Sequence, residues 1–196
     1  MRPIVHVPNQ ILTTSAQTVT AFDHKLENLI SEMKGTLKAT VDPKGVGLAA
    51  PQVGVSLRVF LTRPTEKEAI RVFINPEIIK RSESLTDGLP AQAGMPDRGN
   101  NASTSLKAGK LEGCLSIPNI WGKVRRASSL TLKYQDETGA IRQEQFSGFL
   151  ATIIQHETDH VNGILFTQRV LEQKEKVYQA AKDVDGNEVL EEIKLH

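Results

Sequence analysis

Cysteine is almost missing from this chain, because its 196 residues include only Cys114. A single cysteine excludes an internal disulfide and is typical of proteins that work in a reducing compartment. A lone cysteine is most often a small, buried apolar residue. The residues around Cys114 must therefore decide whether it has a chemical role.

The chain also lacks a long apolar run and an excess of charge of either sign. No stretch approaches the roughly 18 consecutive apolar residues of a membrane-spanning helix, and the first residues do not have the layout of a signal peptide. Lys and Arg number 24 against 23 Asp and Glu, which gives no nucleic-acid or anionic-membrane signal. We therefore expect a soluble, cytoplasmic protein without a membrane partner, folded as one domain over residues 1–196.

The hydrophobic pattern of the first 80 residues predicts a helix followed by strands. Apolar residues recur at helical spacing within 20–39, and we expect Thr20 with Asp23 to cap this helix. Branched and aromatic residues predict strands at 56–62 and 71–79.

The pattern of residues after 80 predicts a hairpin and a last helix, together with two segments, 82–110 and 183–196, that we expect to lie outside the regular core. Residues 82–110 are rich in Gly, Pro, Ser and Asn without periodicity, which predicts a flexible insertion, with a lid as the alternative. Alternating residues predict a β-hairpin over 128–146, and helical spacing predicts a last helix over 167–181. Residues 183–196 are expected to form a C-terminal surface extension.

A metal-binding pattern, HExxH, occupies residues 156–160. Positions i and i+4 of a helix lie on the same face, so His156 and His160 can bind one metal ion while Glu157 stands beside it as a proton carrier. Apolar residues precede the pattern, and a metal would give buried imidazoles a partner. We expect the helix to begin near Gly148 and to stop at Asn162-Gly163.

A catalytic metal needs three protein ligands and an open position, so a third ligand must come from elsewhere in the chain. Glu172 and Glu175 are candidates, although they fit the polar face of the last predicted helix. Cys114 is the alternative, because a thiolate binds divalent ions well and its segment, bounded by glycine and proline, is unlike a core strand. The remaining histidines are expected at the surface: His6, His24 and His196.

Residues 45–54, GVGLAAPQVG, form a loop rich in glycine and small side chains. The GxGxxG spacing and the P-loop lysine are both missing, so a phosphate-binding loop is not predicted. Small residues instead let a peptide backbone approach closely. Gln52 offers an amide that either caps the turn or donates to a ligand, and the residues alone leave both roles open.

Three segments together resemble the signature motifs of the peptide deformylase family: GVGLAAPQVG at 45–54, EGCLSIP at 112–118 and QHETDHVNGILF at 155–166. They follow in the family's order, and the resemblance extends over most of residues 1–170. The segment with Cys114 separates the pattern from the zincin proteases that share HExxH. The resemblance implies an α+β fold, in which a central HExxH-bearing helix packs among antiparallel strands with an N-terminal and a C-terminal helix.

The resemblance implies a metal-dependent hydrolase that removes the N-formyl group from the N-terminal formylmethionine of newly synthesised polypeptides and releases formate. Cys114, His156 and His160 would bind one divalent metal ion, Fe2+ in the cell, which Zn2+, Ni2+ or Co2+ can replace. Water activated by the metal would attack the formyl carbon, with Glu157 as general base and then general acid.

The resemblance also assigns the groups that meet the substrate. The Gln52 side chain and the Leu115 backbone N–H would stabilise the oxyanion. An apolar pocket that includes Val46 and Ile153 would take the methionine side chain, although both residues also suit plain core packing. The backbone at Gly47 and near Glu112 would align the peptide in extended form. The residues expected to bind the peptide are Val46, Gly47, Glu112 and Ile153.

Three positions depart from the family pattern, and none has a chemical role: Leu111, Trp121 and Val161. The main alternative function is a zinc-dependent peptidase of HExxH type, which leaves Cys114 and Gln52 without a role. A second alternative is a catalytically silent relative that binds nascent chains or ribosomes, but no catalytic position is substituted. The metal in the cell, preference beyond formylmethionine, oligomeric state and ribosome contact stay open.

Overall fold

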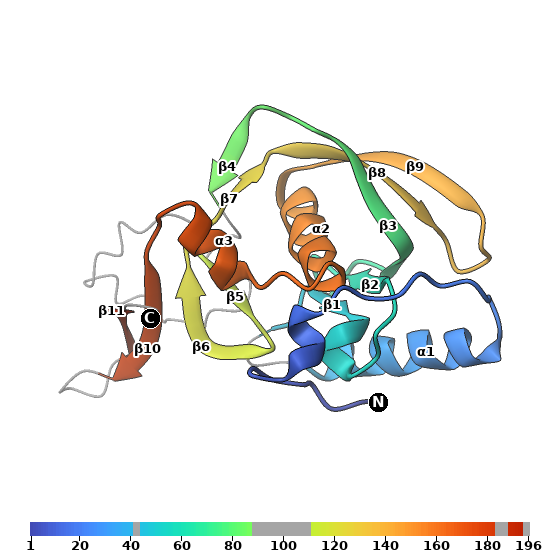
Figure 1. Ribbon diagram of the computed structural model, residues 1–196, viewed down its shortest axis with the longest axis horizontal. Helices are drawn as coiled ribbons and strands as arrows, with labels where there is room; N and C mark the ends of the chain where they lie inside the picture. The colour runs from blue at the N-terminus through green and yellow to red at the C-terminus, as the bar shows by residue number, and fades with distance from the viewer. Residues whose placement is uncertain (41–43, 88–110, 183–187, 194–196) are drawn as a thin grey trace.

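The computed structural model describes residues 1–40, 44–87, 111–182 and 188–193. Helices and strands alternate irregularly along the chain around a central helix, α2 (Figure 1). In chain order the elements are η1 (Gln10–Thr13), α1 (His24–Ala39), β1 (Gly47–Ala49), η2 (Ala50–Val53), β2 (Val59–Thr62), β3 (Arg71–Arg81), β4 (Leu85–Asp87), β5 (Glu112–Cys114), β6 (Ile117–Gly122), β7 (Arg125–Ala127), β8 (Ser129–Gln135), β9 (Ile141–Ser147), α2 (Gly148–Val161), α3 (Phe166–Glu172), β10 (Val177–Lys182) and β11 (Glu188–Ile193).

The largest sheet has five antiparallel strands in the order β1-β2-β3-β8-β9. It contains both strands predicted near residues 56–62 and 71–79, and the predicted hairpin is confirmed as β8 and β9. The hairpin turns at Gly139, whose φ of 85° suits glycine because a side chain there would be strained. Asp136 supports the turn by accepting hydrogen bonds from the backbone N–H groups of Thr138 and Ala140.

A second sheet, in the order β11-β10-β6-β5, corrects the prediction for the end of the chain. The last helix was predicted over 167–181, but α3 ends at Glu172 and β10 begins at Val177. Lys174 adopts a positive φ of 55°, which interrupts the helix, and Val177 pairs with Gly122 of β6. Hydrogen bonding to an open sheet edge thus outweighs the helical spacing of the apolar residues.

The segment expected to be a C-terminal surface extension, residues 183–196, contains strand β11, which pairs with β10 in antiparallel register. The predicted insertion at 82–110 falls mostly outside the described residues. Its first part forms β4, which pairs with β7 in a two-stranded ribbon.

Helix α1 confirms the predicted N-terminal helix and covers one face of the large sheet. Its apolar side chains are buried against β1, β2 and β3. The cap is Asp23 without a contribution from Thr20: the Asp23 carboxylate accepts hydrogen bonds from the backbone N–H groups of Lys25 and Leu26, at 3.0 and 3.1 Å. Within the described residues, no helix is long and apolar enough to cross a membrane.

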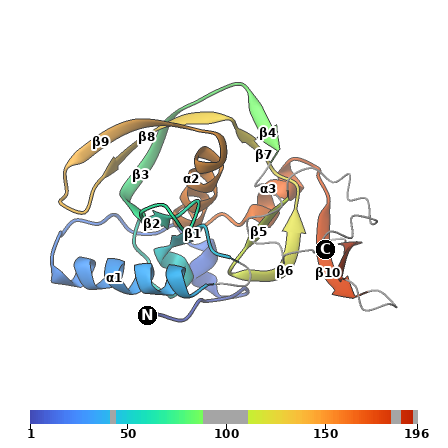
Figure 2. The same ribbon diagram turned by 180° about the vertical axis from the view of Figure 1, so that it is seen from behind.

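Helix α2 lies between α1 and the β8–β9 hairpin, as the view from behind shows (Figure 2). The apolar side chains of α2 pack against the aromatic residues of the large sheet, where the rings of Phe60 and Phe73 stack with centroids 4.8 Å apart. A separate, smaller apolar cluster includes Cys114 and combines side chains of β5, β6, α3 and β10. The fold is therefore α+β, with antiparallel sheets and three described α-helices.

Candidate metal centre

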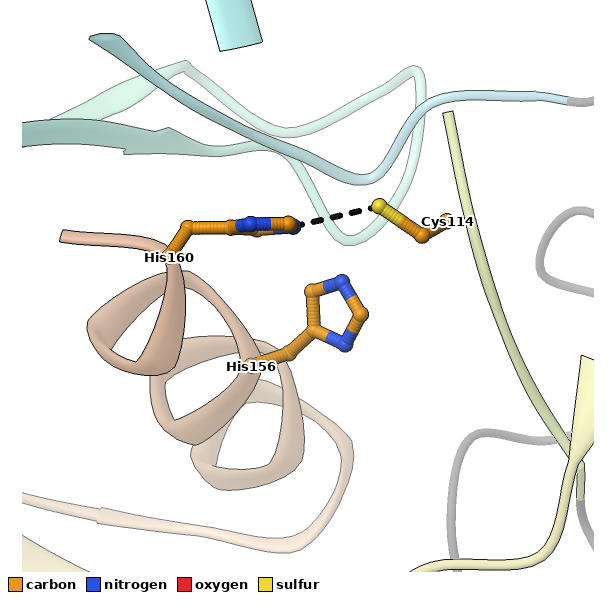
Figure 3. Close-up of side chains that lie close together, drawn as sticks. All are labelled: Cys114, His156 and His160. Atoms are coloured by element: carbon orange, nitrogen blue, oxygen red, sulfur yellow. Dashed lines mark hydrogen bonds between the residues drawn. The ribbon is translucent and has the colours of Figure 1, made fainter. Parts of the chain in front are cut away.

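Helix α2 places His156 and His160 one turn apart, and both side chains are almost inaccessible, at 6% and 1% exposure. Their rings lie 4.9 Å apart and project from the same side of the helix (Figure 3). The helix begins at Gly148 and ends before Asn162, with Gly163 at a φ of 72°. The i, i+4 spacing thus brings two imidazoles together inside the protein.

Cys114 approaches the two histidines from β5, on the other side of the site (Figure 3). Its Sγ lies 3.1 Å from Nε2 of His160, and the candidate ligand atoms of Cys114, His156 and His160 all lie within 4.8 Å of one another. In the part of the chain that the structure describes, this is the one group of at least three such side chains that could hold a metal ion. The structure does not bring Glu172 or Glu175 into this group.

The chemistry of the three donors fits a divalent transition metal. Burial works against ionisation of Cys114, but His160 and His156 outweigh it and lower the pKa of the thiol to about 5. A thiolate with two imidazoles is a donor set that suits zinc and iron. Two buried polar atoms beside it have no hydrogen-bond partner among the described residues, Nδ1 of His160 and Oε2 of Glu157. With three protein donors, a bound metal would keep one coordination position for water.

Glu112 contacts the ring of His156 and fixes its orientation. Its side chain is fully buried, and Oε2 lies 3.1 Å from Nδ1 of His156. Burial opposes the charge, but Arg126 and His156 hold the pKa of Glu112 at about 2. An ionised carboxylate accepts a hydrogen bond, so His156 carries its proton on Nδ1 and presents Nε2 to a metal.

Glu157 lies against Gly47 of β1, on the loop of small residues. A Cβ placed on Gly47 would lie 2.2 Å from Oε1 of Glu157, so only glycine leaves room for this carboxylate. Burial raises the pKa of Glu157 to about 7, although His156 and His160 act in the opposite direction. A carboxyl group with a pKa near neutrality can both accept and release a proton.

The structure confirms that Gln52 caps the turn, while donation from its amide to a ligand stays a prediction. Its Oε1 accepts a hydrogen bond from the Ala49 N–H at 2.8 Å, which caps the turn. Its Nε2 donates toward Cys114 Sγ at 3.4 Å and Ser116 Oγ at 3.3 Å. The bond to Ala49 therefore directs the NH2 group of Gln52 toward Cys114, one of the candidate metal ligands, and toward Ser116.

A pocket opens beside these side chains and contains most of the residues predicted to meet a substrate. The predicted residues that line it are Val46, Gly47, Gln52, Cys114, Leu115, Ile153, His156 and Glu157. Glu112 does not line the pocket, because its carboxylate points to Arg126 and His156. Trp121, which departs from the family pattern, forms a wall of the pocket.

Sequence reasoning missed several residues of the site. Arg126 pairs with Glu112 through two hydrogen bonds of 2.9 Å and with Asp159 at 2.6 Å, and all three are buried. Asp159 sits inside the HExxH pattern, where its position next to His160 was a signal. Ser116 lies within the motif at 112–118, which was a signal, whereas Arg126 carries no local signal because its partners lie elsewhere in the chain.

Comparisons with known proteins agree with this geometry. The model of the family described as polypeptide deformylase matches residues 1–176. A peptide deformylase of Dehalococcoides mccartyi is 34% identical over 194 residues, which covers 99% of this chain and 98% of that relative. The crystal structure of peptide deformylase from Thermotoga maritima has a TM-score of 0.71 at 32% identity and covers 87% of this chain and 97% of that chain.

A second solved structure, the Met-Ala-Ser-bound class I type b peptide deformylase of Acinetobacter baumannii, has a TM-score of 0.70 at 32% identity. It covers 87% of this chain and 98% of that chain. These matches confirm the resemblance carried by the three motifs. The chain belongs to the polypeptide deformylase family.

Proposed function

We propose that the protein removes the N-formyl group from the N-terminal formylmethionine of newly synthesised polypeptides and releases formate. The observation that carries this proposal is the buried cluster of Cys114, His156 and His160 with the Glu157 carboxylate beside it, open to a pocket. Family membership supplies the substrate class.

Cys114, His156 and His160 would hold one divalent metal ion, whose chemistry is to lower the pKa of a water molecule and to polarise the formyl carbonyl. The donor set suits Fe2+ and Zn2+ alike. We place Fe2+ at this site in the cell, with Zn2+, Ni2+ or Co2+ able to replace it. Metal analysis of anaerobically purified protein tests this assignment.

Glu157 is the proposed general base and acid. Its carboxylate lies in the pocket wall next to Gly47, and Oε2 is free of hydrogen-bond partners among the described residues. It takes a proton from the attacking water and then delivers it to the nitrogen of the leaving amine. The peptide leaves with a free amino terminus, and the formyl group leaves as formate.

Gln52 and Leu115 are the proposed donors to the negative charge that develops on the formyl oxygen. Both line the pocket, and Ala49 already holds the Gln52 amide in one orientation. The two hydrogen bonds from Gln52 Nε2 are long, so this NH2 group can turn to a stronger acceptor. Removal of one oxyanion donor costs roughly 10²–10³ in rate.

The apolar part of the same pocket is the proposed site for the methionine side chain. Val46 and Ile153 face it from opposite segments, the glycine-rich loop and α2. The relative from Acinetobacter baumannii has been solved with Met-Ala-Ser bound, which supports a peptide that begins with methionine. Backbone near Gly47 and Glu112 is proposed to align the peptide in extended form. We place this reaction in the cytoplasm. We also propose contact with the ribosome, which cosedimentation of the protein with ribosomes tests.

The decisive experiment offers the metal-loaded protein formyl-Met-Ala-Ser, acetyl-Met-Ala-Ser and unformylated Met-Ala-Ser, and measures formate and peptide fragments. Formate from the first peptide alone is the expected result. A zinc peptidase would instead cut peptide bonds and leave formate at background. Glu157→Ala should lose at least roughly 10²-fold in rate, while the exposed Glu172→Ala control retains it. Wild-type activity in Glu157→Ala would contradict the proposed mechanism.

A further inference from the structure

A chain of alternating charges runs from the metal ligand His156 to the protein surface. Arg126 of β7 forms a two-point contact with Glu112, whose Oε2 lies 3.1 Å from His156 Nδ1. On its other side Arg126 donates to Asp159 Oδ2 at 2.6 Å. Arg169 of α3 then donates to both oxygens of Asp159, at 3.2 and 2.7 Å.

The balance of charge in this chain depends on Arg169. Arg126, Glu112 and Asp159 are each at most 6% exposed, and by themselves they hold one cation against two carboxylates. Arg169 supplies the second cation, and its side chain is 30% exposed, so it connects the buried group to solvent. A buried carboxylate without a full partner is costly, so loss of Arg169 would draw Arg126 toward Asp159 and away from Glu112.

The backbone next to Arg126 is held in place by hydrogen bonds to α2. Gln155 of α2 binds both the N–H and the C=O of Ala127, the residue after Arg126, at 3.1 and 2.9 Å. The backbone of β7 is therefore held to α2, and only the guanidinium of Arg126 can respond to its two carboxylates. That response is passed directly to Glu112 and to the ring of His156.

We propose that Arg169 is a positioning residue for the metal site, which acts on His156 through Asp159, Arg126 and Glu112. This proposal rests on the metal centre of the proposed function. Outer partners of metal-bound histidines fix the ring orientation and the protonated nitrogen, and their loss typically weakens metal binding about 10–100-fold. The structure thus makes α3 a part of the metal site although it contributes no ligand.

The experiment measures metal retention without substrate. Protein loaded with Co2+ is titrated with a competing chelator, and the cobalt absorption gives the dissociation constant and the rate of loss. Arg169→Gln is expected to bind Co2+ about tenfold more weakly than wild type, and Glu112→Gln about 10–100-fold more weakly. Glu172→Gln is the matched control: it removes the carboxylate charge from the 2.9 Å ion pair of Arg169 with Glu172 but leaves both contacts with Asp159, so its affinity should equal wild type.

Coupling between the two ends separates positioning from simple stabilisation. Because Glu112→Gln already cuts the chain, adding Arg169→Gln should cause no further loss of Co2+ affinity. Additive losses would overturn the proposal, as would an Arg169→Gln protein that melts at a lower temperature without metal but binds Co2+ as wild type does.

If Arg169→Gln does not fold, Arg169→Lys decides the matter, since it retains the charge and loses the two-point contact. Weaker Co2+ binding in Arg169→Lys supports positioning, and wild-type binding overturns it. If the variants weaken Co2+ binding as expected but wild type releases no formate from formyl-Met-Ala-Ser, the proposed function fails and the role of Arg169 stands.

Discussion

The contact between Gly47 and Glu157 gives the sharpest test of the site, through Gly47→Ala. A Cβ at this position would lie 2.2 Å from Oε1 of Glu157, about 1.2 Å short of the 3.4 Å at which ordinary contact begins. Cδ and Cγ of Glu157 would lie 2.7 and 2.9 Å away. The whole end of this side chain must therefore move, because a single rotation of the carboxylate does not clear the methyl group.

The expected loss follows from that displacement. A catalytic group misplaced by about 1 Å can cost roughly 10²-fold in rate, which corresponds to about 2.7 kcal/mol of transition-state stabilisation. Glu157 is 4% exposed, so it has little room to recover its position. We expect kcat/KM for formyl-Met-Ala-Ser, measured as formate release, to fall about 100-fold, while Co2+ or Zn2+ content stays at one ion per chain.

Gly45→Ala on the same loop is the control for this prediction. Its added Cβ would contact Leu37, Thr40 and Leu115 at 3.0 to 3.4 Å and would not meet Glu157. Gly45→Ala should therefore affect thermal stability more than kcat/KM. A Gly47→Ala protein that retains more than about half of the wild-type kcat/KM would refute the reasoning that this glycine makes room for Glu157.

Three further predictions concern the metal, the buried ions and a surface turn. Dialysis against a chelator should abolish formate release, re-addition of Co2+ should restore it, and full activity after chelation would contradict the metal site; the metal should also stabilise the fold by about 2.7 kcal/mol when free Co2+ is near 100 times its Kd. Arg126→Met leaves the buried Glu112 without its arginine partner and leaves Asp159 paired with Arg169 alone, so it should lower the free energy of unfolding by about 3–5 kcal/mol in urea titrations, whereas a loss below about 1 kcal/mol would show that the ion network is not a main support of the fold. Hydrogen bonds from Thr138 and Arg142 lower the pKa of Asp136 from 3.8 to about 2, so its contribution to stability is present above pH 4 and is lost as the pH falls toward 2; wild type and Asp136→Asn should therefore differ most above about pH 4 and converge near pH 2, and a difference independent of pH would contradict this.

Local spacing in the sequence accounts for the parts of the protein that were predicted correctly. The N-terminal helix and the β8–β9 hairpin follow from side-chain periods of 3.6 and 2, which depend only on neighbours along the chain. The pairing of His156 with His160 has the same origin, since residues four apart on a helix share a face. The three segments that resemble the family's signature motifs then made Cys114 the third candidate ligand.

Only the tertiary structure decided which distant residues support that site. Arg126 meets Glu112 across 14 positions and Asp159 across 33, and no local pattern encodes such pairings. The requirement for Gly47 beside Glu157 likewise arises where β1 packs against α2. At the end of the chain, apolar spacing suggested a helix over Val177–Ala181, but the open edge of β6 offered backbone hydrogen bonds and the segment became a strand. The sequence by itself predicted the pairing of the two histidines through short-range helix geometry and the role of Cys114 through the family motifs, whereas the buried charges around them depend on contacts that exist only once the sheets and α2 have packed together.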